Sequence, residues 1–432
     1  MLIQFTVAVD GREVGSESRE LSGSAAEVEE QIRQMQQRTG RMALEPALLR
    51  IADQIPAPRC CGRAMASRGQ RVITVRTTFG EISVSRRVSC CERCGWRCAP
   101  ADAQFCCGRH RITRPLAQRV CQLATLAHFP QMPELLANQL GVTLGHDTLL
   151  ELVHDIGGGA DRLRRAEAAR SARQRRPPAC WLGEAPRRIW ISVDGIMYCT
   201  NLREPDPEHP GRKRLVWQQM KVGCVAWEDA DGVWHKQLVW GRESPEEFGA
   251  ALWRLACQCG YQEADDKLFA ADGGAWCWDI QARYFGEAVG ILDWYHASEH
   301  VWDAAKLVAP ADPGAWAQAA FTELRHHGGE GLLAWLTPHI APRRGTARKA
   351  LENLKTYLVG QRDHLDYPAY RAQGWPIGTG RMESSCKQLV GVRLKGPGMH
   401  WTEAGALAIT ALKAIDLNGQ WQAFWNNLAL ST

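Results

Sequence analysis

The sequence lacks any apolar run of about 18 residues, the length that a membrane-spanning helix needs. Its N-terminus, MLIQFTVAVDGREVG, has no basic region before the apolar stretch, whereas a secretory signal peptide carries one there. Internal repeats and low-complexity tracts are also missing. We therefore expect no membrane span and no signal peptide, and we expect a cytoplasmic protein.

The composition is that of ordinary folded protein, with 45% hydrophobic and 23% charged residues among 432, enough for two to four domains. The net charge is only +5, but it is unevenly distributed. The stretch RLRRAEAARSARQRR (162–176) carries seven arginines against one glutamate. Such local basicity permits contact with DNA phosphates, and a solvated linker helix is the alternative. The candidate DNA-binding residues here are Arg173, Arg175 and Arg176.

Sixteen cysteines are present, and eight of them fall between positions 60 and 107. In a reducing compartment, such clustering favours metal binding over disulfides. The segment RVITVRTTFGEISVSRRV alternates around Gly80 as a hairpin would, and cysteine pairs stand at its two ends. That arrangement predicts a zinc ribbon, in which four thiolates converge on one structural Zn²⁺. The expected ligands are Cys60, Cys61, Cys91 and Cys94.

The first cysteine pair is irregular, because its two members are adjacent and Pro58 occupies the usual partner position. Buried or reactive free cysteines are the alternative to a metal site. Four further cysteines are spare candidates for ligands: Cys90, Cys98, Cys106 and Cys107.

Further strand and helix patterns flank this cysteine segment. Residues 1–9 alternate as a strand does, and residues 24–53 are typical of a helix. The later stretch MPELLANQLGVTLGHDTLLELVHDIGGG (132–159) predicts a short helix, a turn at Gly141-Val142 and a second helix near Thr143. This pattern is typical of a DNA-binding helix-turn-helix, although two packed helices without a DNA role share it.

A linker at 175–188 precedes the largest domain. The apolar runs of this domain predict three strands, a helix, and then strand, helix, strand, helix. This is the order of a ribonuclease-H-like core. From about 303 to 370 the pattern is helical, with breaks at Pro310, Gly328-Gly329, Pro338 and Pro342. We expect an α/β fold: a ribonuclease-H-like catalytic core with an all-helical insertion, preceded by a zinc-ribbon and helix-turn-helix DNA-binding region.

Three aspartates each follow a predicted apolar strand, and one glutamate lies in the first turn of a late helix. These acids are Asp194, Asp272, Asp293 and Glu383. Carboxylates gathered at one sheet edge repel one another, and hard cations such as Mg²⁺ or Mn²⁺ offset that repulsion. Two such ions can activate an attacking oxygen and stabilise a leaving one. For any single aspartate, a strand-end Asp-Gly turn is the structural alternative.

Further side chains surround these acids. In DWYHASEH (293–300), His296 is expected to face the acidic edge, contacting Asp293 or a phosphate. The alternatives are a helix-capping aspartate beside a satisfied histidine, or a second zinc site with His300. Cations follow Glu383 and suit a groove that holds DNA beside the metals: Lys387, Arg393 and Lys395.

Four motifs together carry a family resemblance: SVDGIMY, AADGGAWCW, LDWYHASEH and GTGRMESSCKQLVGVRLKGPGMHW. They resemble bacterial insertion-sequence transposases of the ISKra-like group, relatives of the Mutator-type DDE enzymes. The resemblance implies a catalytic triad of Asp194, Asp272 and Glu383, spaced by 78 (272 − 194) and 111 (383 − 272) residues. The DWYH at 293–296 matches the C/DxxH signature of Mutator relatives, which makes Asp293 the alternative second acid.

The expected function is therefore a bacterial, nucleoid-associated DDE transposase that cleaves the DNA ends of an insertion sequence and transfers them to target DNA. Pairing two ends implies at least a dimer. The alternatives are a non-catalytic DNA-binding regulator derived from a transposase, and a ribonuclease-H-like nuclease that cuts without joining. The expected domains are an N-terminal strand and helix (1–56), a zinc ribbon (57–110), a helical DNA-binding region with its basic linker (111–176), the catalytic core (187–302 and 375–432) and a helical insertion (303–374).

Overall fold

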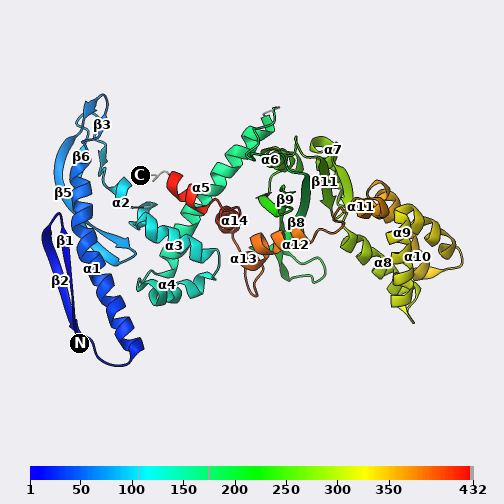
Figure 1. Cartoon of the computed structure of the whole chain (residues 1–432), viewed down its shortest axis with the longest axis horizontal. Coiled ribbons are helices and arrows are strands. Elements are labelled where there is room, and N and C mark those ends of the chain that lie inside the picture. Colours follow the sequence, from blue (N-terminus) through cyan, green and yellow to red (C-terminus); the bar gives the residue numbers. More distant parts are fainter. Residues whose placement is uncertain (107, 174–175, 429–432) are drawn as a thin grey trace. The chain divides into compact units, whose positions relative to one another are not determined.

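The structure is a computed structural model that describes residues 1–106, 108–173 and 176–428 (Figure 1). The chain forms two compact units, and the boundary between them falls inside one long helix. The first unit comprises Met1–Ala160 and the C-terminal segment from Gly419, and the second comprises Asp161–Asn418. Within the described residues, no helix combines the length and apolar character required to cross a bilayer.

The first unit begins with a hairpin and a long helix. β1 (Leu2–Val9) pairs with β2 (Arg12–Glu20) across a turn at Asp10 and Gly11, both of which have positive φ. α1 (Ala25–Gln54) follows, and a capping box between Ser24 and Glu27 fixes its start. The predicted first strand and helix are confirmed, whereas β2 was not predicted.

A three-stranded antiparallel sheet packs against α1. Its strands are β5 (Ala66–Thr77), β6 (Gly80–Cys90) and β7 (Arg97–Cys98). A small two-stranded sheet of β3 (Arg59–Cys60) and β4 (Arg63–Ala64) precedes them. The hairpin turn at Gly80 has φ 105°, as its glycine allows. The predicted hairpin is therefore confirmed, and its inward-facing residues form a core with the last turns of α1.

Helices complete the first unit. α4 (Met132–Leu140) is capped by Gly141, whose φ of 61° is left-handed, and α5 (His146–Arg173) begins at His146 rather than near Thr143. The helix–turn–helix order at 132–159 is thus present in the structure, with a longer turn than expected. The helices are α2 (Asp102–Phe105), α3 (Arg114–Ala124), α4 (Met132–Leu140), α5 (His146–Arg173) and α15 (Trp421–Asn427), with 3₁₀ turns at Gly108–His110 and Phe129–Gln131.

The second unit is built on a five-stranded mixed sheet in the order β10-β9-β8-β11-β12. β8, β9 and β10 are antiparallel neighbours, whereas β11 is parallel to both β8 and β12. The mixed α/β class and the order of these elements are as the sequence predicts. The strands are β8 (Arg188–Pro205), β9 (Lys213–Glu228), β10 (Trp234–Gly241), β11 (Asp266–Ala271) and β12 (Val289–Leu292).

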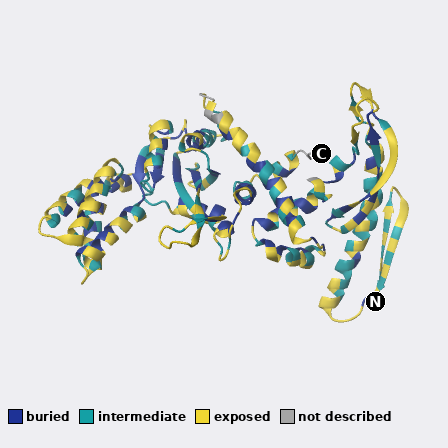
Figure 2. Cartoon of the chain, turned by 180° about the vertical axis from the view of Figure 1, so that it is seen from behind, coloured by how far each residue is buried: buried dark blue, intermediate teal, exposed yellow. Residues whose placement is uncertain are grey.

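Helices cover both faces of this sheet, and its strands are among the most deeply buried segments of the unit (Figure 2). On one face, Ile191 and Val193 form a core with α6 (Pro245–Gln258) and α7 (Ala275–Tyr284). Alternate residues of a strand point to opposite faces. Asp194 therefore points to the other face, where α12 (Gly380–Cys386) packs against β8 and β9.

Residues 303–374 are helical, as predicted. α8 (Trp294–Val308), α9 (Pro313–Ile340), α10 (Gly345–Gly360) and α11 (Tyr367–Ala372) occupy most of this stretch. α9 is kinked at Gly328, which has φ 66°. The predicted break at Pro338 is wrong, because that proline lies inside the last turn of α9.

The late helices return to the sheet. α12 (Gly380–Cys386) runs into a π-helical turn at Lys387–Gly391 and then into α13 (Val392–Leu394). α14 (Glu403–Leu417) begins after the N-cap Thr402. Figure 1 shows α12, in orange, beside the green strand β8 of the same unit. The C-terminal part of the chain thus reaches the edge where the acids of β8 and β11 lie.

Candidate functional site

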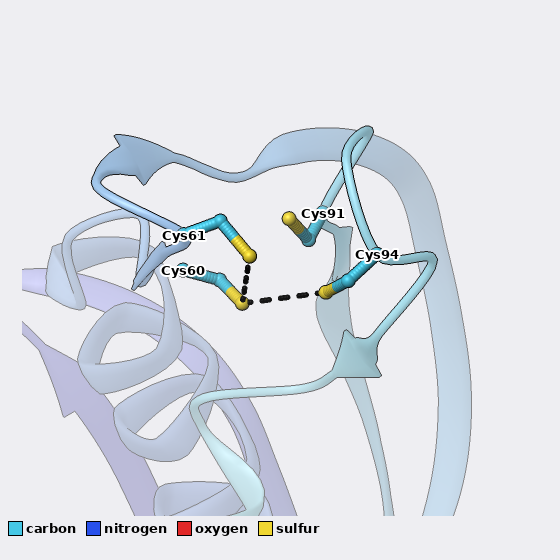
Figure 3. Close-up of side chains that lie close together, drawn as sticks. All are labelled: Cys60, Cys61, Cys91 and Cys94. Carbon is cyan, nitrogen blue, oxygen red and sulfur yellow. Dashed lines mark hydrogen bonds between the residues drawn. The ribbon is translucent and has the colours of Figure 1, made fainter.

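Four cysteine sulfur atoms converge in the first unit. The Sγ atoms of Cys60, Cys61, Cys91 and Cys94 all lie within 4.8 Å of one another (Figure 3). The Cys60 Sγ is 3.8 Å from that of Cys61 and 3.6 Å from that of Cys94. Zinc–sulfur bonds of about 2.3 Å in a tetrahedron place sulfur atoms about 3.8 Å apart. The cluster could therefore hold a zinc ion.

Local backbone conformation brings the two cysteine pairs together. Cys61 and Gly62 both have positive φ, and they turn the chain back between β3 and β4. After β6, the Gly95 amide donates to the Cys91 carbonyl at 2.9 Å, which closes a tight loop. The hairpin β5–β6 holds these two turns side by side, because one directly precedes β5 and the other directly follows β6.

The thiols differ in their electrostatic setting. Hydrogen bonds from the Cys94 and Arg93 amides lower the pKa of Cys91 to about 7, which favours the thiolate that metals bind. The hydrogen bond with Cys94, followed by burial, raises the pKa of Cys60 to about 12. A divalent cation would reverse that effect, because coordination deprotonates a thiol.

The spare cysteines lie outside this cluster. The Cys90 thiol donates to backbone carbonyls, and the Cys98 Sγ lies 4.0 Å from the Met65 sulfur. Cys106 is buried in the core beneath α1. Cys107 lies outside the described residues. The structure thus brings together the four thiols that the sequence favours.

Asp194 lies inside β8, which corrects the expectation that it ends its strand. β8 continues to Pro205 with β9 as its antiparallel partner. Its parallel pairing with β11 stops one residue before Asp194, where Val193 faces Ala271. Asp194 therefore stands where the parallel part of the sheet ends, and the two-stranded β8–β9 extension continues beyond it.

Asp272 directly follows β11 and faces the same edge. The Gly274 amide donates to its Oδ1 at 2.9 Å, and the intervening Gly273 has φ 95°. Burial raises the pKa of Asp194, and the negative charge of Asp272 adds to this rise. The Gly195 amide, 2.6 Å from Asp194 Oδ1, opposes it. The two aspartates thus lie within electrostatic reach of each other.

Asp293 is a buried N-cap. Its Oδ2 accepts from the His296 amide at 3.3 Å, at the start of α8. Its Oδ1 accepts from the Thr379 amide at 2.8 Å, directly before α12. Because both oxygens receive backbone donors, Asp293 ties α8 to the segment that leads into α12. This geometry favours the helix-capping alternative for Asp293.

Glu383 is exposed on α12. One turn further along this helix, the Cys386 thiol donates to Asp194 Oδ2 at 3.5 Å. Within the described ranges, however, only the cysteine cluster brings three or more potential metal-binding side chains within 4.8 Å of one another. The structure therefore brings Asp194 close to Asp272 and to the helix that carries Glu383. The three carboxylates do not all lie within 4.8 Å of one another.

The histidines of α8 make local contacts. His296 Nδ1 is 3.7 Å from the Glu299 carboxylate, and its ring centre is 5.8 Å from that of His300. His300 stacks on Tyr357 of α10 at 3.8 Å. The charge of His296 opposes, as the smallest contribution, the rise in the pKa of Asp194. His296 thus lies near the acidic edge, and the described residues there form no second zinc cluster.

The candidate DNA-binding cations differ in exposure. Lys387 and Lys395 are exposed, as are Arg173 and Arg176, whereas Arg175 lies outside the described residues. Arg393 is fully buried, with its guanidinium 5.6 Å from the centre of the Trp401 ring. The π-helical turn before α13 shifts the helical register, and so a residue expected at the surface points inward.

Sequence reasoning missed two groups of contacts at this edge. The buried thiols of Cys277 and Cys386 each donate to one of the strand aspartates. Gln361, just after α10, donates to the Gly273 carbonyl at 3.0 Å. The contacts of Cys386 and Gln361 have no sequence signal, because each depends on how a distant helix packs against the sheet. Cys277, in contrast, lies only five residues after Asp272.

No family model matches the chain, and no curated protein does. Among solved structures, the chain is similar to the Drosophila P element transposase strand transfer complex. The identity is 9%, the match covers 73% of this chain and 81% of that one, and the TM-score is 0.26. A TM-score this low does not show a shared fold.

Replacing Cys94 by serine should remove bound zinc, because a tetrahedral site loses one of its four thiolates. We expect purified full-length protein to hold about one zinc per chain and Cys94→Ser close to none. Zinc content by mass spectrometry checks this. Cys98→Ser is the matched control and should keep its zinc, since its sulfur lies outside the cluster. Equal zinc content in all three proteins would contradict the assignment.

Replacing Asp194 by asparagine should stabilise the second unit. The raised pKa of Asp194 means that its charged form costs stability at neutral pH. This cost is absent below the unfolded pKa of about 3.9 and grows as the pH rises through the folded pKa. In EDTA at pH 7, Asp194→Asn should raise the melting temperature by about 2–4 °C, and the difference should vanish near pH 4.

Thermal unfolding at several pH values measures this effect. Asp279→Asn, which removes an exposed acid from α7, should leave the melting temperature unchanged. A lower melting temperature for Asp194→Asn at pH 7 would show that the charged carboxylate stabilises the fold.

Proposed function

We propose that this chain is a DDE-type DNA transposase that cleaves the ends of an insertion sequence and joins them to target DNA. The observation that carries this proposal is that the parallel pairing of β8 with β11 brings Asp194 and Asp272 to one sheet edge, with the helix of Glu383 docked onto Asp194. Such a gathering of like charges costs stability unless cations neutralise it. It is therefore the arrangement expected of a metal-dependent site.

The sheet supports a ribonuclease-H-like core at the level of analogy. Three antiparallel strands followed by two parallel ones, in the order β10-β9-β8-β11-β12, are the arrangement of that fold. The proposed core comprises 187–302 and 375–432, with 303–374 as a helical insertion. The second compact unit ends at Asn418, and α15 belongs to the other unit.

The proposed metal ligands have the chemistry that Mg²⁺ and Mn²⁺ prefer. Asp194, Asp272 and Glu383 offer carboxylate oxygens, and hard divalent ions bind oxygen. Two ions held there would activate the attacking oxygen and stabilise the leaving one. In the first step water attacks a phosphodiester and releases a 3′-hydroxyl. In the second step that hydroxyl attacks target DNA, and a target 3′-oxygen leaves.

The first unit and the surface cations would hold DNA. The zinc ribbon (57–110) and the helical region with its basic linker (111–176) are the proposed end-binding modules. Lys387 and Lys395 are exposed on the segment after Glu383, where they can neutralise phosphates. Pairing of two DNA ends requires at least a dimer.

One observation favours a second candidate, a non-catalytic DNA-binding regulator. The three carboxylates are not drawn together into a cage, and Glu383 is exposed. A chain that bound transposon ends without cutting them could tolerate this spacing. Metal-dependent nicking of the DNA ends would separate the two candidates, since both would bind DNA.

Changing the triad acids should abolish cutting. On labelled duplexes that carry the element's own ends, we expect nicking with Mg²⁺ or Mn²⁺ and none with EDTA. Asp272→Asn and Glu383→Ala should lower the nicking rate at least about 1,000-fold, because metal binding is lost. Asp293→Asn should stay within about tenfold of the wild type, since asparagine also caps helices.

Asp303→Asn, at an exposed acid paired with Lys306, is the matched control and should cut normally. Loss of nicking in Asp293→Asn but not in Asp272→Asn would move the second metal ligand to Asp293. End binding without nicking under any metal would favour the regulator and overturn the transposase.

Removing the surface cations should weaken DNA binding in a salt-dependent way. The double variant Lys387→Ala, Lys395→Ala should reduce the slope of log affinity against log salt by about 1.8, the effect of two phosphate contacts. Mobility shifts at several salt concentrations measure this slope. The control pair Lys306→Ala, Arg348→Ala removes exposed cations that already have acidic partners on the insertion. An identical slope in both pairs would contradict a role for Lys387 and Lys395.

A further inference from the structure

Two buried thiols contact the two strand aspartates of the proposed metal site. Cys277 Sγ donates to Asp272 Oδ1, and Cys386 Sγ donates to Asp194 Oδ2, each at 3.5 Å. Cys277 is fully buried, and Cys386 is 4% exposed. The thiols come from different helices, α7 and α12. The same pairing of aspartate and thiol therefore occurs twice at one sheet edge.

In each pair the thiol adds a second donor to a carboxylate that a backbone amide already holds. Asp272 Oδ1 accepts from the Gly274 amide as well as from Cys277. Asp194 accepts from the Gly195 amide through Oδ1 and from Cys386 through Oδ2. Two donors fix the orientation of a carboxylate better than one.

The chemistry of the donor suits a metal site. An ionised carboxylate only accepts hydrogen bonds, and so the thiol must donate. A thiol is small and nearly apolar, and it can be buried beneath the carboxylate without other partners. A lysine or arginine in the same place would neutralise the negative charge that a divalent cation needs. Among the residues the structure describes, the hydrogen bonds to these two carboxylates come from backbone amides and thiols alone.

Cys386 also links two of the proposed ligands. It lies on α12 one turn after Glu383. Its contact with Asp194 therefore docks the helix that carries Glu383 against β8. Removing the thiol would loosen both the Asp194 carboxylate and the position of Glu383.

We infer that Cys277 and Cys386 are positioning residues of the metal site, each holding one strand aspartate in the orientation that binds a divalent cation. This inference rests on the proposed function, because it assumes that Asp194 and Asp272 bind metal. It assigns the thiols no contact with the metal or with DNA.

The test measures Mn²⁺ affinity of the full chain, with zinc retained, by electron paramagnetic resonance and calorimetry. The Asp194→Asn, Asp272→Asn double variant defines the binding that belongs to this edge. Cys277→Ala and Cys386→Ala should each weaken that binding about tenfold, the usual effect of losing an outer-shell partner. Cys277→Ser and Cys386→Ser keep a donor and should recover affinity to within about threefold of the wild type.

The matched control is Cys259→Ala, which removes a fully buried thiol of the same unit. It should bind Mn²⁺ as the wild type does, and thermal unfolding checks that all variants fold. Wild-type affinity in both alanine variants would overturn the inference and leave the proposed function standing. Equal weakening in alanine and serine variants would also overturn it, since the hydrogen bond would then be irrelevant. If the wild type binds no Mn²⁺ at this edge, both the proposed function and the inference fall.

Discussion

The repulsion between Asp194 and Asp272 is the constraint on which the proposed active edge depends. The parallel pairing of β8 with β11 carries both carboxylates to the same place, and burial of Asp194 adds to the cost. The fold offsets this cost in part with backbone amides from Gly195 and Gly274. The remaining negative charge is available to a cation. Without a cation, the charged aspartates therefore lower the stability of the fold at this edge, as expected of a site that binds metal ions.

The elements around this edge hold it from several directions. Asp293 ties the start of α8 to the segment before α12, and Cys386 ties α12 to Asp194. Gln361, at the end of α10, supports the turn after Asp272 through the Gly273 carbonyl. The helical insertion is thus joined to the acidic edge by direct hydrogen bonds. The packing of the insertion therefore affects the geometry of the site.

Much of the fold follows from the sequence because its signals are local. Apolar runs mark β8 to β12, and Ser244 with Glu247 forms the capping box that starts α6. The cysteine cluster could also be predicted, since its pairs stand at the two ends of one hairpin. β2 was missed because REVGSESRE has almost no apolar alternation, and its pairing with β1 decides its conformation.

The site was predictable only in part, since its details depend on tertiary packing. The acids could be assigned to strand ends, but the extension of β8 past Asp194 arises from its pairing with β9. Arg393 is buried after a π-helical turn, and no local sequence pattern predicts that turn. Cys277 reaches Asp272 across the short turn into α7, but the thiol contact of Cys386 needs the finished packing of α12 against β8. Such contacts become visible only in the three-dimensional structure.

The central claim is that Asp194, Asp272 and Glu383 together hold divalent ions beside DNA. Its most direct test is anomalous diffraction from crystals of the full chain grown with Mn²⁺ and a duplex that carries a transposon end. The account predicts manganese peaks beside Asp194 and Asp272, with Glu383 as a further ligand. Manganese peaks that avoid Asp194 and Asp272, or no peak at this edge with DNA bound, would contradict it.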